Sequence, residues 1–319
     1  MNQYFYWSII SFYNKIKYNG IAFYLRKHCK RTHQVVFWKK SREEHAMPHL
    51  FSYRDKELYS HHTIDRTPVP EDFSMHAHEL MEIYFFISGK GSYLVEGTQY
   101  PLQPNDILIL RAAETHTLTI SPEEPYERIA IHFSPTLLAS VDPELRLLRP
   151  FLDRPLGQLN YYPAAKDPEG RLRAAFAGFR FGEVPDIRLN LIARLLLFLT
   201  TLDGQYEQAG MYHVPAQGLQ GQLVAYVNEH LFENISLQSV ADHFYRSRSQ
   251  ISRIFQLATG SPLWEYVTLK RLMAARAMIQ RGETAGNACL ACGFSDYSSF
   301  FRAYRAHFGH VPKEDAAKI

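Results

Sequence analysis

The chain has 319 residues, enough for two ordinary domains, and 46% of them are hydrophobic, enough to give each domain a core. Its apolar runs are too short to cross a membrane, and three cysteines are too few for a disulfide framework, so we expect a protein of the reducing cytoplasm. Basic residues outnumber acidic ones in residues 1–45 and 218–319, whereas acidic residues dominate 46–217, so only part of the chain should approach a polyanion.

Residues 1–46 are basic and aromatic and have no clear periodicity. The apolar stretch from Tyr4 to Tyr13 lacks a charged leader and a small-residue cleavage site, so it does not fit a signal peptide. We interpret 1–46 as an extension ahead of the functional start, with Met47 as the next methionine. The alternative is an amphipathic helix bound to a membrane surface.

Residues 68–134 predict a β domain. Five short runs are rich in β-branched and aromatic residues, and turns that contain Gly, Pro or Asn separate them. We expect strands at Leu80–Ser88, Ser92–Glu96, Ile107–Leu110, His116–Ile120 and Tyr126–Phe133. Short strands at this spacing are typical of a sandwich or a small barrel.

A helical pattern follows the strands. Helices are expected at Glu169–Phe181 and Asp186–Leu202, and the second has a broad apolar face. Such a face needs a partner, which is either the chain's own barrel or a second subunit. The polar, glycine-bearing stretch from Asp203 to Gly218 predicts a linker.

The C-terminal third contains an internal duplication. Ser247, Ile251, Arg253, Phe255 and Gly260 recur 49 positions later as Asp296, Phe300, Arg302, Tyr304 and Gly309. Each set predicts one helix with an N-cap, an apolar face, one exposed arginine and a C-cap glycine. A small residue precedes each helix, Ala241 in the first copy and Cys289 in the second. Such a residue lets two helices cross closely, as a helix-turn-helix requires.

A long helix is expected between the two copies, starting at Ser261-Pro262 and ending near Gly282. About 21 residues at roughly 1.5 Å per residue span about 31 Å. One turn of B-DNA is about 34 Å long. A helix of this length therefore places both recognition helices in successive major grooves on one face of the DNA.

Residues 219–314 resemble the DNA-binding domain of AraC/XylS-type transcription regulators. In the first copy the resemblance is carried by Ile235-Ser236-Leu237, Ala241, Ser252-Arg253-Ile254-Phe255, Thr259-Gly260, Arg271-Leu272 and Ala275-Arg276. In the second it is carried by Gly293-Phe294-Ser295-Asp296, Ser299-Phe300-Phe301-Arg302, Phe308-Gly309 and Pro312. The family usually has large aliphatic residues in place of Ala285 and Ala288, and Tyr-Arg in place of Asp315-Ala316. A less stable or more weakly binding second unit is the expected consequence.

Exposed positions near the start of each recognition helix are expected to reach base edges, with polar and basic neighbours on phosphates. In the first helix these are Ser249, Gln250, Ser252 and Arg253, and in the second they are Tyr297, Ser298, Ser299 and Arg302. The alternative for the two arginines is a surface or intradomain ion pair. Cys289 and Cys292 lack a second ligand pair, so we assign them to core packing rather than to zinc or redox chemistry.

Residues 75–133 resemble the cupin-like ligand domain that often precedes this DNA-binding unit. The resemblance is carried by His76-Ala77-His78, Glu82-Ile83, Ser88-Gly89-Lys90-Gly91, Pro104-Asn105-Asp106 and His132-Phe133. His76, His78 and Glu82 share parity on one strand, and with His116 they match the metal set of cupin enzymes. Regulators of this family mostly bind metabolites without a metal, so we predict neither a metal nor a cofactor.

The two resemblances together predict a mixed two-domain fold. Residues 47–202 are expected to form a cupin-like β-barrel with trailing helices, which serves ligand sensing and dimerisation. A linker follows in 203–217, and residues 218–319 are expected to form an all-α double helix-turn-helix domain. The implied function is sequence-specific transcription regulation rather than catalysis, controlled by a small metabolite such as a sugar. The expected ligand residues are His76, His78, Glu82, Tyr84, Tyr93 and His116.

The expected partners are double-stranded operator DNA, the small-molecule effector, a second copy in a homodimer, and RNA polymerase. Two other functions remain open at this point. One is a cupin metalloenzyme that carries a DNA-binding tail and holds a metal among His76, His78, Glu82 and His116. The other is a constitutive DNA-binding regulator whose β domain serves only dimerisation.

Overall fold

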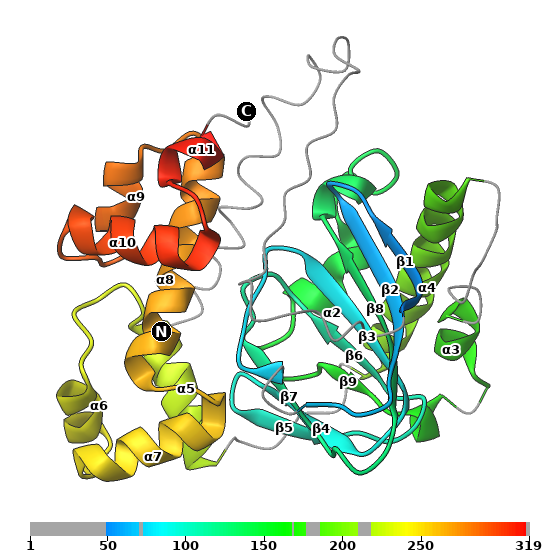
Figure 1. Ribbon diagram of the computed structural model, residues 1–319, viewed down its shortest axis with the longest axis horizontal. Helices are drawn as coiled ribbons and strands as arrows, with labels where there is room; N and C mark the ends of the chain where they lie inside the picture. The colour runs from blue at the N-terminus through cyan, green and yellow to red at the C-terminus, as the bar shows by residue number, and fades with distance from the viewer. Residues whose placement is uncertain (1–48, 70–72, 168, 177–185, 210–217, 317–319) are drawn as a thin grey trace. The chain divides into compact units, whose positions relative to one another are not determined.

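The computed structural model describes residues 49–69, 73–167, 169–176, 186–209 and 218–316 (Figure 1). The basic extension assigned to residues 1–46 lies outside these described residues. In the described residues no helix is long and apolar enough to span a membrane.

The first part is built from two antiparallel sheets. One has six strands in the order β1-β2-β8-β3-β6-β9, and the other has three in the order β5-β4-β7. The strands are β1 His49–Arg54, β2 Leu58–Asp65, β3 Met81–Ser88, β4 Gly91–Val95, β5 Thr98–Pro101, β6 Ile107–Leu110, β7 His116–Ile120, β8 Tyr126–Phe133 and β9 Tyr161–Tyr162. Side chains from both sheets share one buried cluster, so the sheets enclose an interior as a barrel does. The expected β-barrel is confirmed.

All five predicted strands are present, and three of them have the predicted bounds. The early strands β1 and β2 were missed because the predicted β domain began at Pro68. Strand β2 reads Leu-Tyr-Ser-His-His-Thr-Ile-Asp, and its polar side chains conceal a strand that is mostly buried. Polar residues on a buried strand have no alternation that a sequence pattern can detect.

The outer face of the large sheet is covered by helices α2 Arg149–Leu152, α3 Arg171–Phe176 and α4 Ile187–Ala209. Helix α4 lies along this face (Figure 1), where Leu195 and Phe198 pack against Ile83 and Ile129 of the sheet in one core. The apolar face of α4 therefore finds its partner in the chain's own barrel. Burying each such side chain stabilises the fold by roughly 1.5–3 kcal/mol.

Helix α4 is longer than predicted, because it continues through the first residues of the expected linker to Ala209. The reason is a tertiary contact that the sequence does not show. Asp203 accepts two hydrogen bonds from the guanidinium of Arg149, at 3.1 and 2.8 Å. This pair attaches Asp203 to Arg149 of α2, and the helix continues beyond it through the six residues that end at Ala209.

The second part is all helical. Its helices are α5 Leu219–Glu229, α6 Leu237–His243, α7 Arg248–Thr259, α8 Leu263–Gln280, α9 Ala285–Ala291, α10 Tyr297–Phe308 and α11 Pro312–Ala316. Helix α8 runs between two clusters, with α5–α7 at one end and α9–α11 at the other (Figure 1). This confirms the duplicated helix-turn-helix.

The two recognition helices have equivalent ends. The Ser247 side chain caps α7 and the Asp296 side chain caps α10, each accepting a backbone N–H three residues later. Gly260 and Gly309 end these helices at the same φ of 76°, a left-handed conformation that favours glycine. Helix α8 has 18 residues, fewer than expected, because Pro262 is its N-cap rather than its first turn and Arg281 is already its C-cap. Its length is therefore about 27 Å at roughly 1.5 Å per residue.

Candidate DNA interface and effector site

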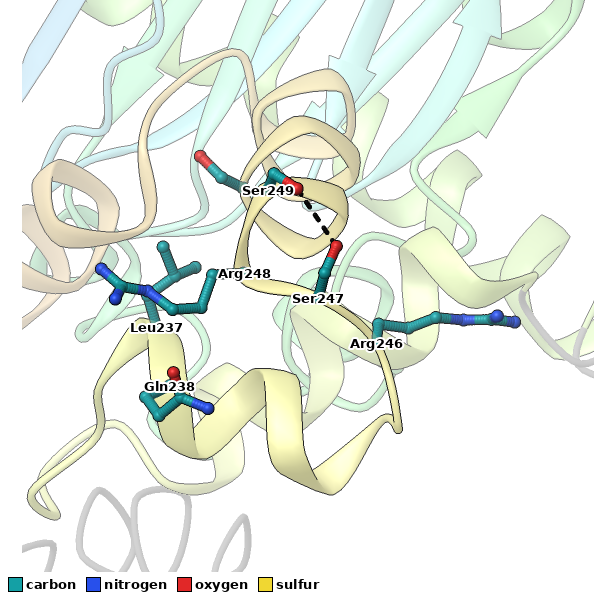
Figure 2. Close-up of a pocket in the computed structure, with 7 residues that line it drawn as sticks. Leu237, Gln238, Arg246, Ser247, Arg248 and Ser249 are labelled. Carbon is teal, nitrogen blue, oxygen red and sulfur yellow. Dashed lines mark hydrogen bonds between the residues drawn. The ribbon is translucent and has the colours of Figure 1, made fainter.

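The first helix-turn-helix presents a polar surface at the start of α7. Its predicted contact residues Ser249, Gln250 and Arg253 are exposed, and Ser252 is half-buried. Figure 2 shows a shallow hollow between α6 and α7, with Arg246 and Arg248 extending to opposite sides of it. The hollow is lined by Leu237, Gln238, Arg246, Ser247, Arg248, Ser249 and Ser252. Exposed hydroxyls between two arginines suit the phosphates and base edges of a groove.

Gln250 has a structural role that the sequence analysis did not assign. Its side-chain Oε1 accepts a hydrogen bond from the backbone N–H of Ser247 at 3.0 Å, and its backbone N–H donates to Ser247 Oγ at 3.3 Å. This reciprocal capping box fixes the start of α7. The amide NH₂ of Gln250 remains available to DNA, so a base contact and the cap use different atoms.

The second helix-turn-helix presents Tyr297, Ser298, Ser299 and Arg302 as exposed residues of α10. The Arg302 guanidinium donates a hydrogen bond to Ser299 Oγ at 3.2 Å. The intradomain ion pair considered for the arginines is absent from the described part of the chain: neither Arg253 nor Arg302 lies within 4.0 Å of a carboxylate. Both arginines thus extend toward solvent from equivalent positions.

Two arginines of α8, Arg271 and Arg276, make structural contacts. Arg271 donates to the carbonyls of Leu231, Glu233 and Gly293, at 2.7, 2.6 and 2.6 Å, and so joins the two helix-turn-helix units. A guanidinium with three carbonyl partners fixes the positions of three backbone segments at once. The distance between the recognition helices therefore depends on α8.

The departure at Asp315 is compensated within the second unit. This buried carboxylate accepts hydrogen bonds from Arg276, Tyr304 and His310. Burial raises the pKa of Asp315, but these three partners outweigh that effect and lower it to about 2. A buried network thus anchors α11 where the family usually has Tyr-Arg.

Cys289 and Cys292 are both buried and both free. Burial raises the pKa of both thiols, to about 12 for Cys292. The protonated Cys292 thiol lies 3.7 Å from Met278 Sδ. These contacts agree with the core-packing interpretation.

All six predicted ligand residues of the barrel come together in its interior. His78 Nε2 lies 2.7 Å and His116 Nε2 lies 3.5 Å from Glu82 Oε2. The ring of His76 packs edge-on against His116, with centroids 4.3 Å apart. Tyr93 bridges the cluster to Tyr84, with centroids 5.8 Å from His116 and 4.8 Å from Tyr84.

Burial and mutual contact set the charges of this cluster. Burial alone would raise the pKa of Glu82, but His132, His78 and His116 lower it well below its usual value, so the carboxylate is ionised. Burial lowers the pKa of His116 well below its usual value and that of His132 to about 3. A charged carboxylate therefore lies among imidazoles of which two are neutral at physiological pH.

Two interior residues of β8, Arg128 and His132, were not among the predicted ligand residues. Glu82 pairs with His132 in the sheet register, and Tyr84 with Ala130, so alternate residues of β8 face the same interior as Glu82. The signal was available, because Arg128 and His132 alternate with Ile129, Ile131 and Phe133, whose side chains lie in the outer core.

The Arg128 guanidinium is surrounded by aromatic rings. Its Cζ lies 4.7 Å from the ring centroid of Tyr126 and 5.5 Å from that of Phe73. Arg128 Nη1 and the Oγ1 of Thr63, opposite it in the register, are buried and lack hydrogen-bond partners among the described residues. Buried polar atoms in proteins normally have hydrogen-bond partners, so these two atoms stand out among the described residues.

A buried carboxylate connects the barrel to α8. Glu96, in the turn after β4, accepts hydrogen bonds from Lys270 Nζ at 2.6 Å, from the Tyr266 hydroxyl, and from the backbone N–H of Thr115 at 2.7 Å. Lys270 Nζ also donates to the carbonyl of Ala113 at 2.8 Å. The DNA-binding helices are thus attached to the strands that enclose the interior.

Two family models match the chain, an AraC-like ligand binding domain over residues 63–167 and a helix-turn-helix domain over 240–317. The transcriptional activator RhaS of Escherichia fergusonii is 29% identical over 93 residues, 29% of this chain and 34% of RhaS, so that match spans about a third of the relative. RhaS of Shigella sonnei is 22% identical over 246 residues, 76% of this chain and 87% of RhaS. The transcriptional regulator ArgR of Pseudomonas aeruginosa is 33% identical over 95 residues, 30% of this chain and 29% of ArgR.

Two solved structures are also similar. ToxT from Vibrio cholerae is 13% identical, covers 82% of this chain and 98% of its own, and has a TM-score of 0.36. The DNA-binding domain of AdpA, solved with a target DNA, is 24% identical, covers 32% of this chain and 92% of its own, and has a TM-score of 0.30. The ligand-binding match precedes the helix-turn-helix match on one chain, and the two observed domains agree with both, so the protein has the domain composition of the AraC type of transcription regulators.

Proposed function

We propose that this regulator binds double-stranded operator DNA through α7 and α10 and responds to a small effector held inside its barrel. The observation that carries the DNA half is the equivalence of the two recognition helices. Arg253 and Arg302 occupy matching positions on helices with the same kind of N-cap and the same C-cap glycine conformation. We assign effector sensing to residues 47–202 and DNA binding to 218–319, with the connection now starting after Ala209.

The effector we propose is a small polar molecule that carries an anionic group, for example a sugar acid. Its hydroxyls would bond the tyrosines and histidines of the interior, and its anion would pair with Arg128. No carboxylate of the described residues lies within 4.0 Å of this guanidinium. A buried charge is costly unless it is paired, so an anionic ligand group compensates a cost that the protein alone leaves open.

A thermal-shift screen of the full chain tests the effector. The panel pairs sugar acids with the neutral sugars of the same shape, and the variant Arg128→Gln is compared with the exposed control Arg66→Gln. A stabilisation by acids that is lost only in Arg128→Gln supports the proposal. Stabilisation by the neutral sugars, retained in both variants, contradicts the anionic effector.

Operator binding is tested on the full chain by fluorescence anisotropy at several salt concentrations. Phosphate contacts make the affinity fall steeply with salt, with a log–log slope of roughly −0.9 for each phosphate that is neutralised. An affinity that does not change between low and moderate salt would contradict the assignment. Operator binding that ignores every effector that stabilises the barrel would favour the constitutive regulator instead.

A homodimer and activation through RNA polymerase are also part of the proposal. Two α4 residues two turns apart, Leu189 and Leu197, are 62% and 56% exposed and would form an apolar seam between two copies. The double variant Leu189→Glu/Leu197→Glu should sediment as a monomer, whereas Val141→Glu, at another exposed apolar residue, should not change the oligomeric state. Activation is suggested by the RhaS relatives, which are activators, and an in vitro transcription assay with purified polymerase tests it.

A further inference from the structure

The barrel interior contains three potential metal-ligand atoms that lie close together. One atom each from His78, Glu82 and His132 lies within 4.8 Å of the other two. Glu82 Oε2 is at the centre of the group, 2.7 Å from His78 Nε2 and 4.0 Å from His132 Nδ1. Ligands bound to one tetrahedral metal at about 2.1 Å lie about 3.4 Å apart, and these separations bracket that value.

Hydrogen bonds at the Nδ1 atoms of His78 and His116 orient the Nε2 atoms of both rings toward Glu82. Nδ1 of His78 lies 2.8 Å from the carbonyl of Leu80, and Nδ1 of His116 lies 2.8 Å from the carbonyl of Glu114. A carbonyl oxygen only accepts, so each Nδ1 carries a hydrogen, which leaves Nε2 as the ring nitrogen that can bind an ion. Both Nε2 atoms face Glu82 Oε2, which is itself an acceptor. Backbone carbonyls orient metal-binding histidines in the same way.

His116 supplies a second, independent observation. Its side chain is fully buried, and its Nε2 has no hydrogen-bond partner among the described residues, although it lies 3.5 Å from the Glu82 carboxylate. A buried nitrogen lone pair facing an anion is unfavourable unless a cation lies between them. His116 is therefore a fourth donor within reach of the same point.

We propose that His78, Glu82 and His132, with His116 as the fourth donor, bind one divalent transition metal ion of the Zn²⁺ class in the barrel. Three imidazoles and one carboxylate suit such ions, whereas Mg²⁺ and Ca²⁺ require mostly oxygen ligands. The side chains of His78 and His132 are 22% and 15% exposed, so the ion can enter from their side. The assignment differs from the set considered on sequence grounds, because His132 takes the place of His76.

Metal titration of the full chain tests the proposal directly. The purified protein is stripped with a chelator and titrated with Co²⁺, whose visible absorption reports tetrahedral nitrogen and oxygen ligands, and bound Zn²⁺ is then measured by elemental analysis. We expect one equivalent per chain. Glu82→Gln and His132→Gln should each weaken binding by at least about 100-fold, because losing only an outer partner of a ligand costs roughly 10–100-fold.

Two control variants make the test specific. His62→Gln removes another histidine of the barrel, one that pairs with Glu127 at 2.7 Å outside the group, and it should retain the ion. His76→Gln should also retain it. Loss of binding in His76→Gln with retention in His132→Gln overturns the ligand assignment.

If the folded wild-type chain binds no ion, the whole proposal is overturned. A proton shared between His78 Nε2 and Glu82 Oε2 would then explain the short distance between them. Binding that persists in both Glu82→Gln and His132→Gln overturns it as well. Circular dichroism of each variant separates lost binding from lost folding. The measurement needs neither operator nor effector, so its outcome is independent of the proposed regulation.

Discussion

Replacing Arg253 by alanine should weaken operator binding more than replacing Arg302. Each arginine can donate two hydrogen bonds to a guanine edge, which contributes roughly 1–3 kcal/mol. Arg302 must first give up its bond to Ser299 Oγ, at 3.2 Å, and a hydrogen bond of this kind contributes roughly 0.5–1.5 kcal/mol. The net loss is therefore roughly 1–3 kcal/mol for Arg253→Ala and about 1 kcal/mol less for Arg302→Ala.

The second unit gives a further reason for this order. Ala285 and Ala288 of α9 are small where the family has larger residues, so less side-chain packing holds α10 against α9. A loosely held helix presents its arginine to the groove less firmly. The buried Asp315 network lies at the other end of this unit and supports α11 rather than α9.

Fluorescence anisotropy with the native operator measures both losses, and each kcal/mol corresponds to about a fivefold change in Kd. Circular dichroism controls for folding, and Lys313→Ala, an exposed cation of α11, controls for the loss of one positive charge. Each arginine variant should also relax sequence preference at one base pair. A larger loss for Arg302→Ala with folding intact, or a loss below twofold for both, refutes the reasoning.

Three further predictions concern stability. Burial raises the pKa of Asp315, but its hydrogen-bond partners lower it from 3.8 to about 2. The contribution of this carboxylate to the free energy of unfolding is therefore present above pH 4, and about 2 kcal/mol is lost as the pH falls to 2. Urea unfolding should show this loss in the wild type and not in Asp315→Asn. Glu96→Ala leaves the buried Lys270 ammonium without its carboxylate partner and should lower the free energy of unfolding in urea by roughly 3–5 kcal/mol. The double variant with Lys270→Met should restore much of this loss, and strictly additive effects of the two changes would contradict the reasoning. Ser247→Ala should cost about 1 kcal/mol through the lost N-cap, whereas Ser298→Ala should leave the melting temperature almost unchanged.

The sequence predicted those parts of the fold in which pattern and packing agree. Strands β6, β7 and β8 have the predicted bounds because each is a short run rich in β-branched, other apolar or aromatic residues. The duplicated helices were predictable because caps and glycines mark both ends of each helix locally. Strand β2 and the last turns of α4 were missed, because a polar strand in the barrel wall and the Arg149–Asp203 pair depend on partners far along the chain.

The site was predicted in part for the same reason. His76, His78 and Glu82 are close in the chain, but the prediction that they share one strand was wrong: β3 begins at Met81, and His76 and His78 belong to the segment before it. His132 and Arg128 enter the interior from β8, and the Glu82–His132 register that brings them there is a property of the folded sheet. A sequence pattern also cannot show which ring nitrogen carries the hydrogen, since that depends on the carbonyls of Leu80 and Glu114.

Three consecutive residues, Thr115 just before β7 and His116 and Thr117 within it, contact different parts of the molecule. His116 faces the barrel interior, the backbone N–H of Thr115 donates to Glu96, and the methyl group of Thr117 lies beside Gly260 at the end of α7. A ligand that shifts this strand therefore changes the support of α7, and thermodynamic reciprocity makes the relation symmetric. If the effector changes the affinity for the operator by some factor, the operator changes the affinity for the effector by the same factor. If the effector strengthens operator binding, a promoter that binds this protein tightly lowers the effector concentration at which the gene under that promoter responds.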